Sequence, residues 1–83
     1  MTFYTFMMRN YRNGTGAKRD LACDMHDDKE KFPRNGVGKY DGWHKILRDY
    51  LEDQRASDDC LSTFEECWEE YVKCEKARLR RNL

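Results

Sequence analysis

The chain has 83 residues, of which 39% are hydrophobic and 39% charged, and its 16 basic residues balance its 16 acidic residues. This length fits one small domain spanning residues 1–83, and an aromatic content of 13% argues against a disordered chain. Zero net charge gives no overall field that would identify a nucleic-acid or membrane partner.

No apolar run approaches the ~20 residues that span a bilayer. The N-terminal residues also lack the basic and apolar regions of a secretory signal. We therefore expect a cytoplasmic protein without a membrane association.

A first helix is predicted over residues 2–12, where Thr2 can serve as the N-cap. Phe3, Phe6 and Met7 recur at helical spacing and form its apolar stripe. A turn containing glycine then ends the helix.

A second helix is predicted over residues 17–28, after the sequence Gly14-Thr15-Gly16. Glycines followed by a lysine at a helix start suggest a phosphate-binding loop, but the spacing of the P-loop motif is absent. We interpret residues 14–16 as a linker. The residues expected to face inward are Ala17, Leu21, Ala22 and Met25.

Phe32 is expected to fill part of the core, and Pro33 to redirect the chain into a glycine-rich loop over residues 34–39. Asp41 is a candidate N-cap for a third helix over residues 42–54. The predicted inward face of this helix consists of Trp43, Ile46, Leu47, Tyr50 and Leu51.

The final helix, residues 58–83, carries the strongest pattern, because large apolar residues recur at spacings of three and four between acidic residues. Ser57 is one candidate N-cap, and Ser62 to Glu65 is an alternative capping box. Trp68 is expected to contact Trp43. No stretch alternates over strand length, so the sequence predicts an all-α bundle of four or five helices. Its predicted core is Phe3, Phe6, Leu21, Phe32, Trp43, Leu47, Leu51, Phe64, Trp68 and Tyr71.

Cys60, Cys67 and Cys74 lie seven residues apart, which places them along one side of the final helix about 10 Å apart. That separation excludes a shared metal ion or a bridge within the helix. We interpret them as small apolar side chains, with a helix dimer seam as the alternative. Cys23 and His26 have the spacing of half a zinc site, but no second pair completes it, so neither a metal nor a cofactor is expected.

The N-terminal Met-Thr-Phe-Tyr segment, Phe32-Pro33 and Tyr50-Leu51-Glu52 resemble the YozE family of small SAM-like proteins of Gram-positive bacteria. The segment Phe-Glu-Glu-Cys-Trp-Glu-Glu-Tyr, residues 64–71, is similar to the Phe-Asp-Glu-Ala-Trp-Glu-Leu-Tyr of that family. The resemblance spans residues 1–71, while the loop after Phe32 is longer and residues 72–83 extend past the usual end. It implies a helical bundle resembling a sterile alpha motif. It implies no function, because the family is largely uncharacterised.

An enzyme needs a nucleophile with a base, or paired carboxylates in a pocket. His26 and His44 fall on separate helices, and His44 near a helix start is expected to face solvent. The acidic runs are expected to lie on exposed helix faces, where Glu69 can pair with Lys73. We therefore expect no catalytic activity.

Two basic clusters, in the glycine-rich loop and at the end of the final helix, could bind phosphates. Cations at a helix C-terminus also complement the helix dipole. The acidic ridge of the final helix and its basic end instead suggest a dipolar surface that binds a protein partner or a second copy. We predict a non-enzymatic interaction module, with nucleic-acid binding as the alternative. A further alternative is an inhibitor encoded by a mobile element that acts as an acidic decoy for a nucleic-acid-binding protein of the host. The predicted contact residues are Arg34, Lys39, Lys73, Lys76, Arg78, Arg80 and Arg81.

Overall fold

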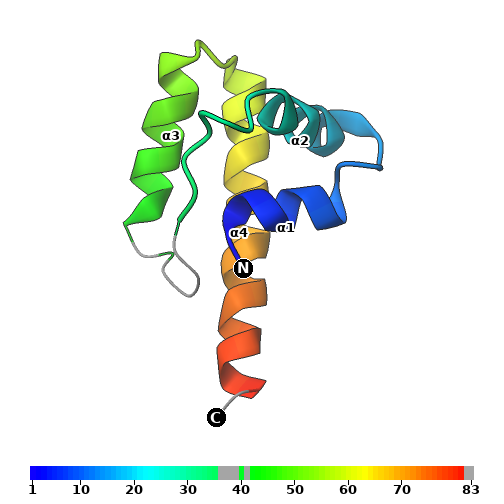
Figure 1. Ribbon diagram of the computed structural model, residues 1–83, viewed down its shortest axis with the longest axis vertical. Coiled ribbons are helices and arrows are strands. Elements are labelled where there is room, and N and C mark those ends of the chain that lie inside the picture. Colours follow the sequence, from blue (N-terminus) through cyan, green and yellow to red (C-terminus); the bar gives the residue numbers. More distant parts are fainter. Residues whose placement is uncertain (36–39, 41, 82–83) are drawn as a thin grey trace.

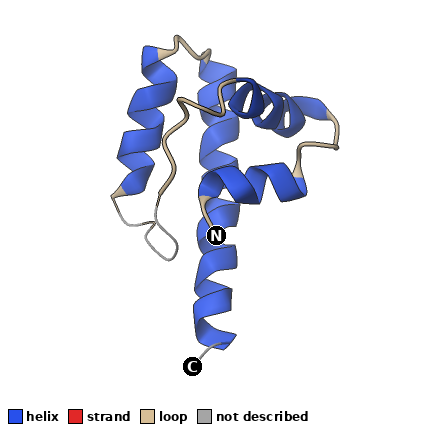
Figure 2. Cartoon of the chain, in the orientation of Figure 1, coloured by secondary structure: helices blue, strands red, loops and turns tan. Residues whose placement is uncertain are grey.

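The computed structural model describes residues 1–35, 40 and 42–81, and the regular elements within these residues are all helices (Figure 2). They are α1 (Phe3–Asn10), α2 (Gly16–Asp27), α3 (Trp43–Asp53) and α4 (Asp58–Arg81). The prediction of an all-α fold with a long C-terminal helix is therefore confirmed.

The long helix α4 is the axis around which the other three helices are arranged (Figure 1). α3 runs beside it on one side, and α1 and α2 lie on the other side, where they also contact each other. Among the described helices, α3 packs only on α4. The C-terminal end of α4 extends beyond this bundle.

Aromatic rings fill the centre of the core, where α1 meets α4. The Phe3 side chain is fully buried, and its ring centroid lies 5.5 Å from Phe64, 5.3 Å from Trp68 and 5.5 Å from Tyr71. The rings meet edge-on or tilted, which are the arrangements that aromatic pairs prefer. Every residue of the predicted core is buried except Trp43.

The inward face of α3 is narrower than the sequence pattern predicts. Leu47 and Leu51 are buried, whereas Trp43 is half-buried at the edge of the core and Ile46 is 47% exposed. A helix that packs on a single neighbour buries only one stripe, and Ile46 falls outside it. The predictions for Trp43 and Ile46 are wrong in this respect. On α2, Ala17 is likewise exposed rather than inward-facing.

Side-chain caps fix the starts of two helices. The Thr2 hydroxyl accepts a hydrogen bond from the Thr5 N–H at 3.1 Å, as predicted. The Ser57 hydroxyl accepts from the Cys60 N–H at 3.1 Å, so α4 begins at Asp58 and the alternative start at Ser62 is wrong. At α3, Gly42 is the N-cap with φ +82°, a left-handed conformation that favours glycine, and the proposed cap Asp41 lies outside the described residues.

A buried network of hydrogen bonds connects the segment after α2 to the start of α1 and to α4. Asn35 is 2% exposed; its Oδ1 accepts from the Phe3 N–H at 2.9 Å and its Nδ2 donates to the Tyr71 hydroxyl at 2.6 Å. That hydroxyl donates to the Met1 carbonyl at 2.6 Å, and the Met1 amino group lies 2.8 Å from the buried Glu75 carboxylate. The network satisfies polar groups that burial would otherwise leave without partners.

Candidate functional site

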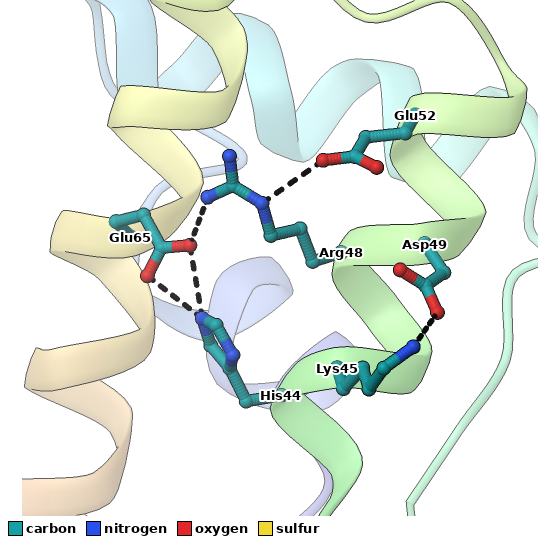
Figure 3. Close-up of polar contacts among 6 residues, drawn as sticks. All are labelled: His44, Lys45, Arg48, Asp49, Glu52 and Glu65. Atoms are coloured by element: carbon teal, nitrogen blue, oxygen red, sulfur yellow. Dashed lines mark hydrogen bonds and ion pairs between the residues drawn. The ribbon is translucent and has the colours of Figure 1, made fainter.

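A cluster of charged side chains joins α3 to α4 at the level of Glu65 (Figure 3). The Glu65 carboxylate lies 2.7 Å from His44 Nε2 and 2.5 Å from Arg48 Nη1, so it binds two successive turns of α3. Arg48 Nε also donates to Glu52 at 3.0 Å within α3. These contacts fix how α3 lies against α4.

The prediction that His44 faces solvent holds only in part, because its side chain is 39% exposed and its ring also packs on α4. Its ring stacks on Phe64 at a centroid distance of 5.5 Å and meets Trp68 at 5.8 Å, where a contact between the two tryptophans was expected. The described contacts of His44 are thus with the Glu65 carboxylate and with the rings of Phe64 and Trp68, all on α4. The arrangement serves packing between the two helices.

The predicted acidic ridge of α4 is divided by the packing. Glu65 faces α3, whereas Glu70 faces the other side, where Lys18 Nζ lies 2.7 Å away and the Tyr11 hydroxyl donates at 2.8 Å. Both carboxylates are half-buried, and Glu66 and Glu69 between them are exposed. The α4 glutamates therefore do not form one solvent-facing surface, because their positions around the helix point Glu65 and Glu70 toward different neighbouring helices.

Glu65 and Glu70 should make the fold sensitive to acid. Burial acts to raise the pKa of each carboxyl, but hydrogen bonds and charges from His44 and Arg48, or from Lys18 and Tyr11, outweigh it and lower the pKa below its usual value. Because the folded pKa lies below the unfolded one, the stabilisation is present above the unfolded pKa of about 4.3 and is lost as the pH falls through the folded pKa.

We expect the free energy of unfolding, measured by urea titration at a series of pH values from 7 to about 3, to fall below pH 5. Since both side chains are more than one-third exposed, each should contribute only about 0.5 kcal/mol. Replacing both by glutamine should flatten this fall, whereas the exposed control Glu66→Gln should leave it unchanged. Equal slopes in the two variants would contradict the role given to Glu65 and Glu70.

The four cysteines are free thiols. Cys67 is fully buried, and burial raises the pKa of its thiol to about 11, so it packs as an apolar side chain. Burial and the nearby Asp24 also raise the pKa of Cys60. In the part of the chain that the structure describes, no group of three or more His, Cys, Asp or Glu side chains could hold a metal ion.

The C-terminal end of α4, residues 73–80, forms a basic arm that is held to the N-terminus at the buried Glu75 and projects beyond the bundle after it (Figure 1). Its four cations, Lys73, Lys76, Arg78 and Arg80, are all exposed. Leu79 stands among them with 47% of its surface exposed, seven residues after the half-buried Val72 and therefore on the same side of the helix. An apolar side chain surrounded by cations is thus presented beyond the bundle.

None of the four cations of the basic arm forms an ion pair with another described residue. The ion pairs of α4 within the described chain use Glu65, Glu70 and Glu75, and the predicted pair of Glu69 with Lys73 is not formed. The helix dipole favours cations in the last turn only. Most of the arm's positive charge is therefore available to a binding partner.

The other predicted contact residues are not joined to the basic arm by any described contact. The Arg34 guanidinium lies over the Tyr4 ring at 4.0 Å and donates to the Lys29 carbonyl at 3.2 Å. Arg34 therefore packs on α1. Lys39 and the side chain of Arg81 lie outside the described residues.

A second surface feature lies where α2, the end of α3 and the start of α4 meet. Two adjoining hollows of about 380 Å³ and about 250 Å³ share Leu21, Asp24, Ser57 and Cys60 in their walls. We call them together the acidic groove. Its apolar floor consists of Leu21, Met25, Phe32, Leu51 and Ala56.

The polar wall of the acidic groove is mainly negative. Asp20, Asp24 and Asp59 are exposed, and Asp28 is half-buried and accepts a hydrogen bond from the Tyr50 hydroxyl. Arg55 is the cation among the residues that line the two hollows. The groove therefore combines an apolar floor with an excess of carboxylates.

The sequence indicated the basic arm through its run of lysines and arginines, but it did not indicate the acidic groove. Asp20, Asp24 and Asp59 come from two helices that are far apart in the chain, and only tertiary packing brings them together. The spacing of four residues between Asp20 and Asp24 was the available signal, since it places both on one face of α2.

No helix in the described chain has both the length and the apolar character needed to cross a membrane. No curated protein and no solved structure matches the chain. A family model described as YozE SAM-like fold matches residues 2–73, which include all of α1, α2 and α3 and the part of α4 that packs in the bundle. The chain belongs to the YozE SAM-like family.

Proposed function

We propose that this protein is a small non-enzymatic interaction module of the cytoplasm that binds an acidic surface of a protein partner through its basic arm. The bundle of α1, α2 and α3 then acts as the platform from which α4 projects. The four exposed cations without described ion pairs supply the attraction to the partner.

The exposure of Leu79 is the observation that carries this proposal. Protein interfaces have an apolar centre surrounded by a polar rim, and Leu79 with Lys76 and Arg80 reproduces that pattern on one helix. A contact with phosphates uses the cations and gains nothing from a leucine side chain. The leucine therefore favours a protein partner.

Nucleic-acid binding is the second candidate, and the same unpaired cations favour it. Phosphate contacts release counterions, so such binding weakens steeply with salt and does not depend on sequence. It should also be insensitive to Leu79. These properties separate the two candidates experimentally.

The test compares the immobilised wild-type protein with three variants in capture from a nuclease-treated lysate of the source cell. Lys76→Glu with Arg80→Glu reverses two charges of the basic arm, and Leu79→Ser removes its apolar side chain. The control reverses two exposed cations elsewhere, Arg9→Glu with Lys31→Glu. We expect the first two variants to lose about tenfold or more of the captured partner, and the control to retain it.

The same proteins are titrated against labelled duplex and single-stranded DNA and RNA at ~50 and ~200 mM salt. Binding that collapses at the higher salt, requires Lys76 and Arg80, and survives Leu79→Ser would replace the protein partner by phosphate recognition. Capture that is unaffected by every variant of the basic arm would contradict both candidates.

A further inference from the structure

We propose that the acidic surface bound by the basic arm is the acidic groove of a second copy of this chain. This inference rests on the proposed function and names its partner. The contact is heterologous, because the arm of one copy meets a different surface, the groove, of the next.

Charge complementarity is the first argument. The acidic groove presents the exposed carboxylates of Asp20, Asp24 and Asp59, of which Asp20 also lies 3.5 Å from Arg19 of its own copy. The basic arm presents four exposed cations that form no ion pair with the described residues of their own copy. The net charge of the chain is zero, so no overall repulsion opposes the approach of a second copy.

Apolar complementarity is the second argument. Leu79 and Ile46 are the exposed large hydrophobic side chains of the described chain, and only Leu79 lies within the basic arm. The larger hollow of the groove, about 380 Å³, has an apolar floor. An apolar cavity of about 150 Å³ already accommodates a benzene ring, so this hollow has room for a leucine side chain.

The position of the two surfaces on α4 prevents a copy from filling its own groove. Cys60, in the wall of the groove, and Leu79, in the basic arm, are on one continuous helix. At 1.5 Å per residue, about 28 Å of helix separates them. Residues at the start of α4 line the groove. The arm lies at the opposite end of this helix (Figure 1). Only a second copy can therefore bring an arm to a groove.

A contact made by one short helical arm buries less surface than the roughly 1,200–2,000 Å² of stable complexes. We therefore expect weak association that depends strongly on concentration. The positive charge of Arg55 repels the cations of the arm, so the Arg55 side chain must turn toward solvent for the contact to form.

The test is sedimentation velocity of the wild-type protein and two matched variants from ~10 μM to ~1 mM, the range in which weak interfaces associate. The arm variant is Lys76→Glu with Arg80→Glu, and the groove variant is Asp20→Lys with Asp24→Lys, both at exposed positions. The groove control, Asp27→Lys with Asp53→Lys, changes exposed carboxylates that do not line the groove. Thermal melts verify that every variant is folded.

We expect the mass of the wild-type protein and of the groove control to rise with concentration, while the arm variant and the groove variant each remain monomeric. An equimolar mixture of these two variants should form a dimer, because the intact groove of one can receive the intact arm of the other. Growth of the wild-type protein beyond a dimer indicates a chain of copies, whereas a plateau at the dimer indicates that two copies exchange arms.

A wild-type protein that stays monomeric, a groove variant that associates like the wild type, or a mixture that forms no dimer would overturn the inference. The proposed function is then judged separately by the capture experiment. Arm-dependent capture of another protein by a monomeric chain would leave the proposed function standing while removing the second copy as its partner.

Discussion

Trp68→Ala is expected to lower the free energy of unfolding by about 3–5 kcal/mol, the largest effect of any single substitution considered for this chain. Trp68 is 8% exposed, and its ring lies 5.3 Å from Phe3, 6.0 Å from Phe64 and 5.2 Å from Tyr71. Truncation leaves a cavity between α1, α3 and α4 and removes contacts to four rings at once, since the His44 ring also lies 5.8 Å away.

Urea unfolding followed by far-UV circular dichroism measures this loss without depending on tryptophan fluorescence. Trp43→Ala is the matched control, because the same residue type is only half-buried there and should cost less than half as much. Where Trp68→Ala is too unstable to measure, Trp68→Phe keeps most of the ring and should lose a smaller amount. A Trp68→Ala protein as stable as the wild type would mean that this ring contributes little to the core.

Asn35→Ala is expected to cost about 2–3 kcal/mol, because it leaves buried polar groups without their partners. The Phe3 N–H loses its acceptor at the start of α1, and the Tyr71 hydroxyl loses the donor that lies 2.6 Å away. Asn35 is 2% exposed, so water cannot freely replace the amide.

A double-mutant cycle with Tyr71→Phe tests this assignment. Removing the Tyr71 hydroxyl first should make Asn35→Ala less costly, because one of the two lost hydrogen bonds is then already absent. The free energies of unfolding of the wild type, both single variants and the double variant give the coupling. Fully additive costs would contradict a direct contribution from the hydrogen bond between Asn35 and Tyr71.

The helices and most of the core could be predicted from the sequence, because apolar residues at helical spacing report burial directly. Phe3, Phe64 and Trp68 belong to such patterns and are buried. The pattern overestimated the width of the buried face of α3. A stripe of five apolar residues does not reveal that α4 is the only described helix that packs on it. Ile46 lies outside that contact and is exposed.

The polar side chains were less predictable, because their partners are set by tertiary packing. In the sequence, Asn35 stands next to glycines, a context in which asparagine usually indicates a turn. In the structure it is buried between Phe3 and Tyr71. Glu65 and Glu70 belong to runs of acids that resemble a solvated face. Their interhelical partners depend on which neighbour each side of α4 meets, and local spacing does not contain that information.

The basic arm was predictable from its composition, but its separation from the bundle was not. Periodicity marks where the apolar stripe of α4 weakens after Tyr71, while only the structure shows that none of the other described helices accompanies residues 73–80 (Figure 1). The acidic groove forms where α2, the end of α3 and the start of α4 meet, so it too depends on tertiary packing.

The place of α4 in the chain determines when the protein can fold during synthesis. α1, α2 and α3 all pack on α4, yet the ribosome makes α4 after them. Until Trp68 and Tyr71 have left the ribosome, the apolar face of α1 has only α2 to cover part of it, and α3 has no helix to pack on. Contacts between residues this distant in sequence form late. The nascent chain therefore stays open and accessible to chaperones until α4 has emerged, and then folds as one unit.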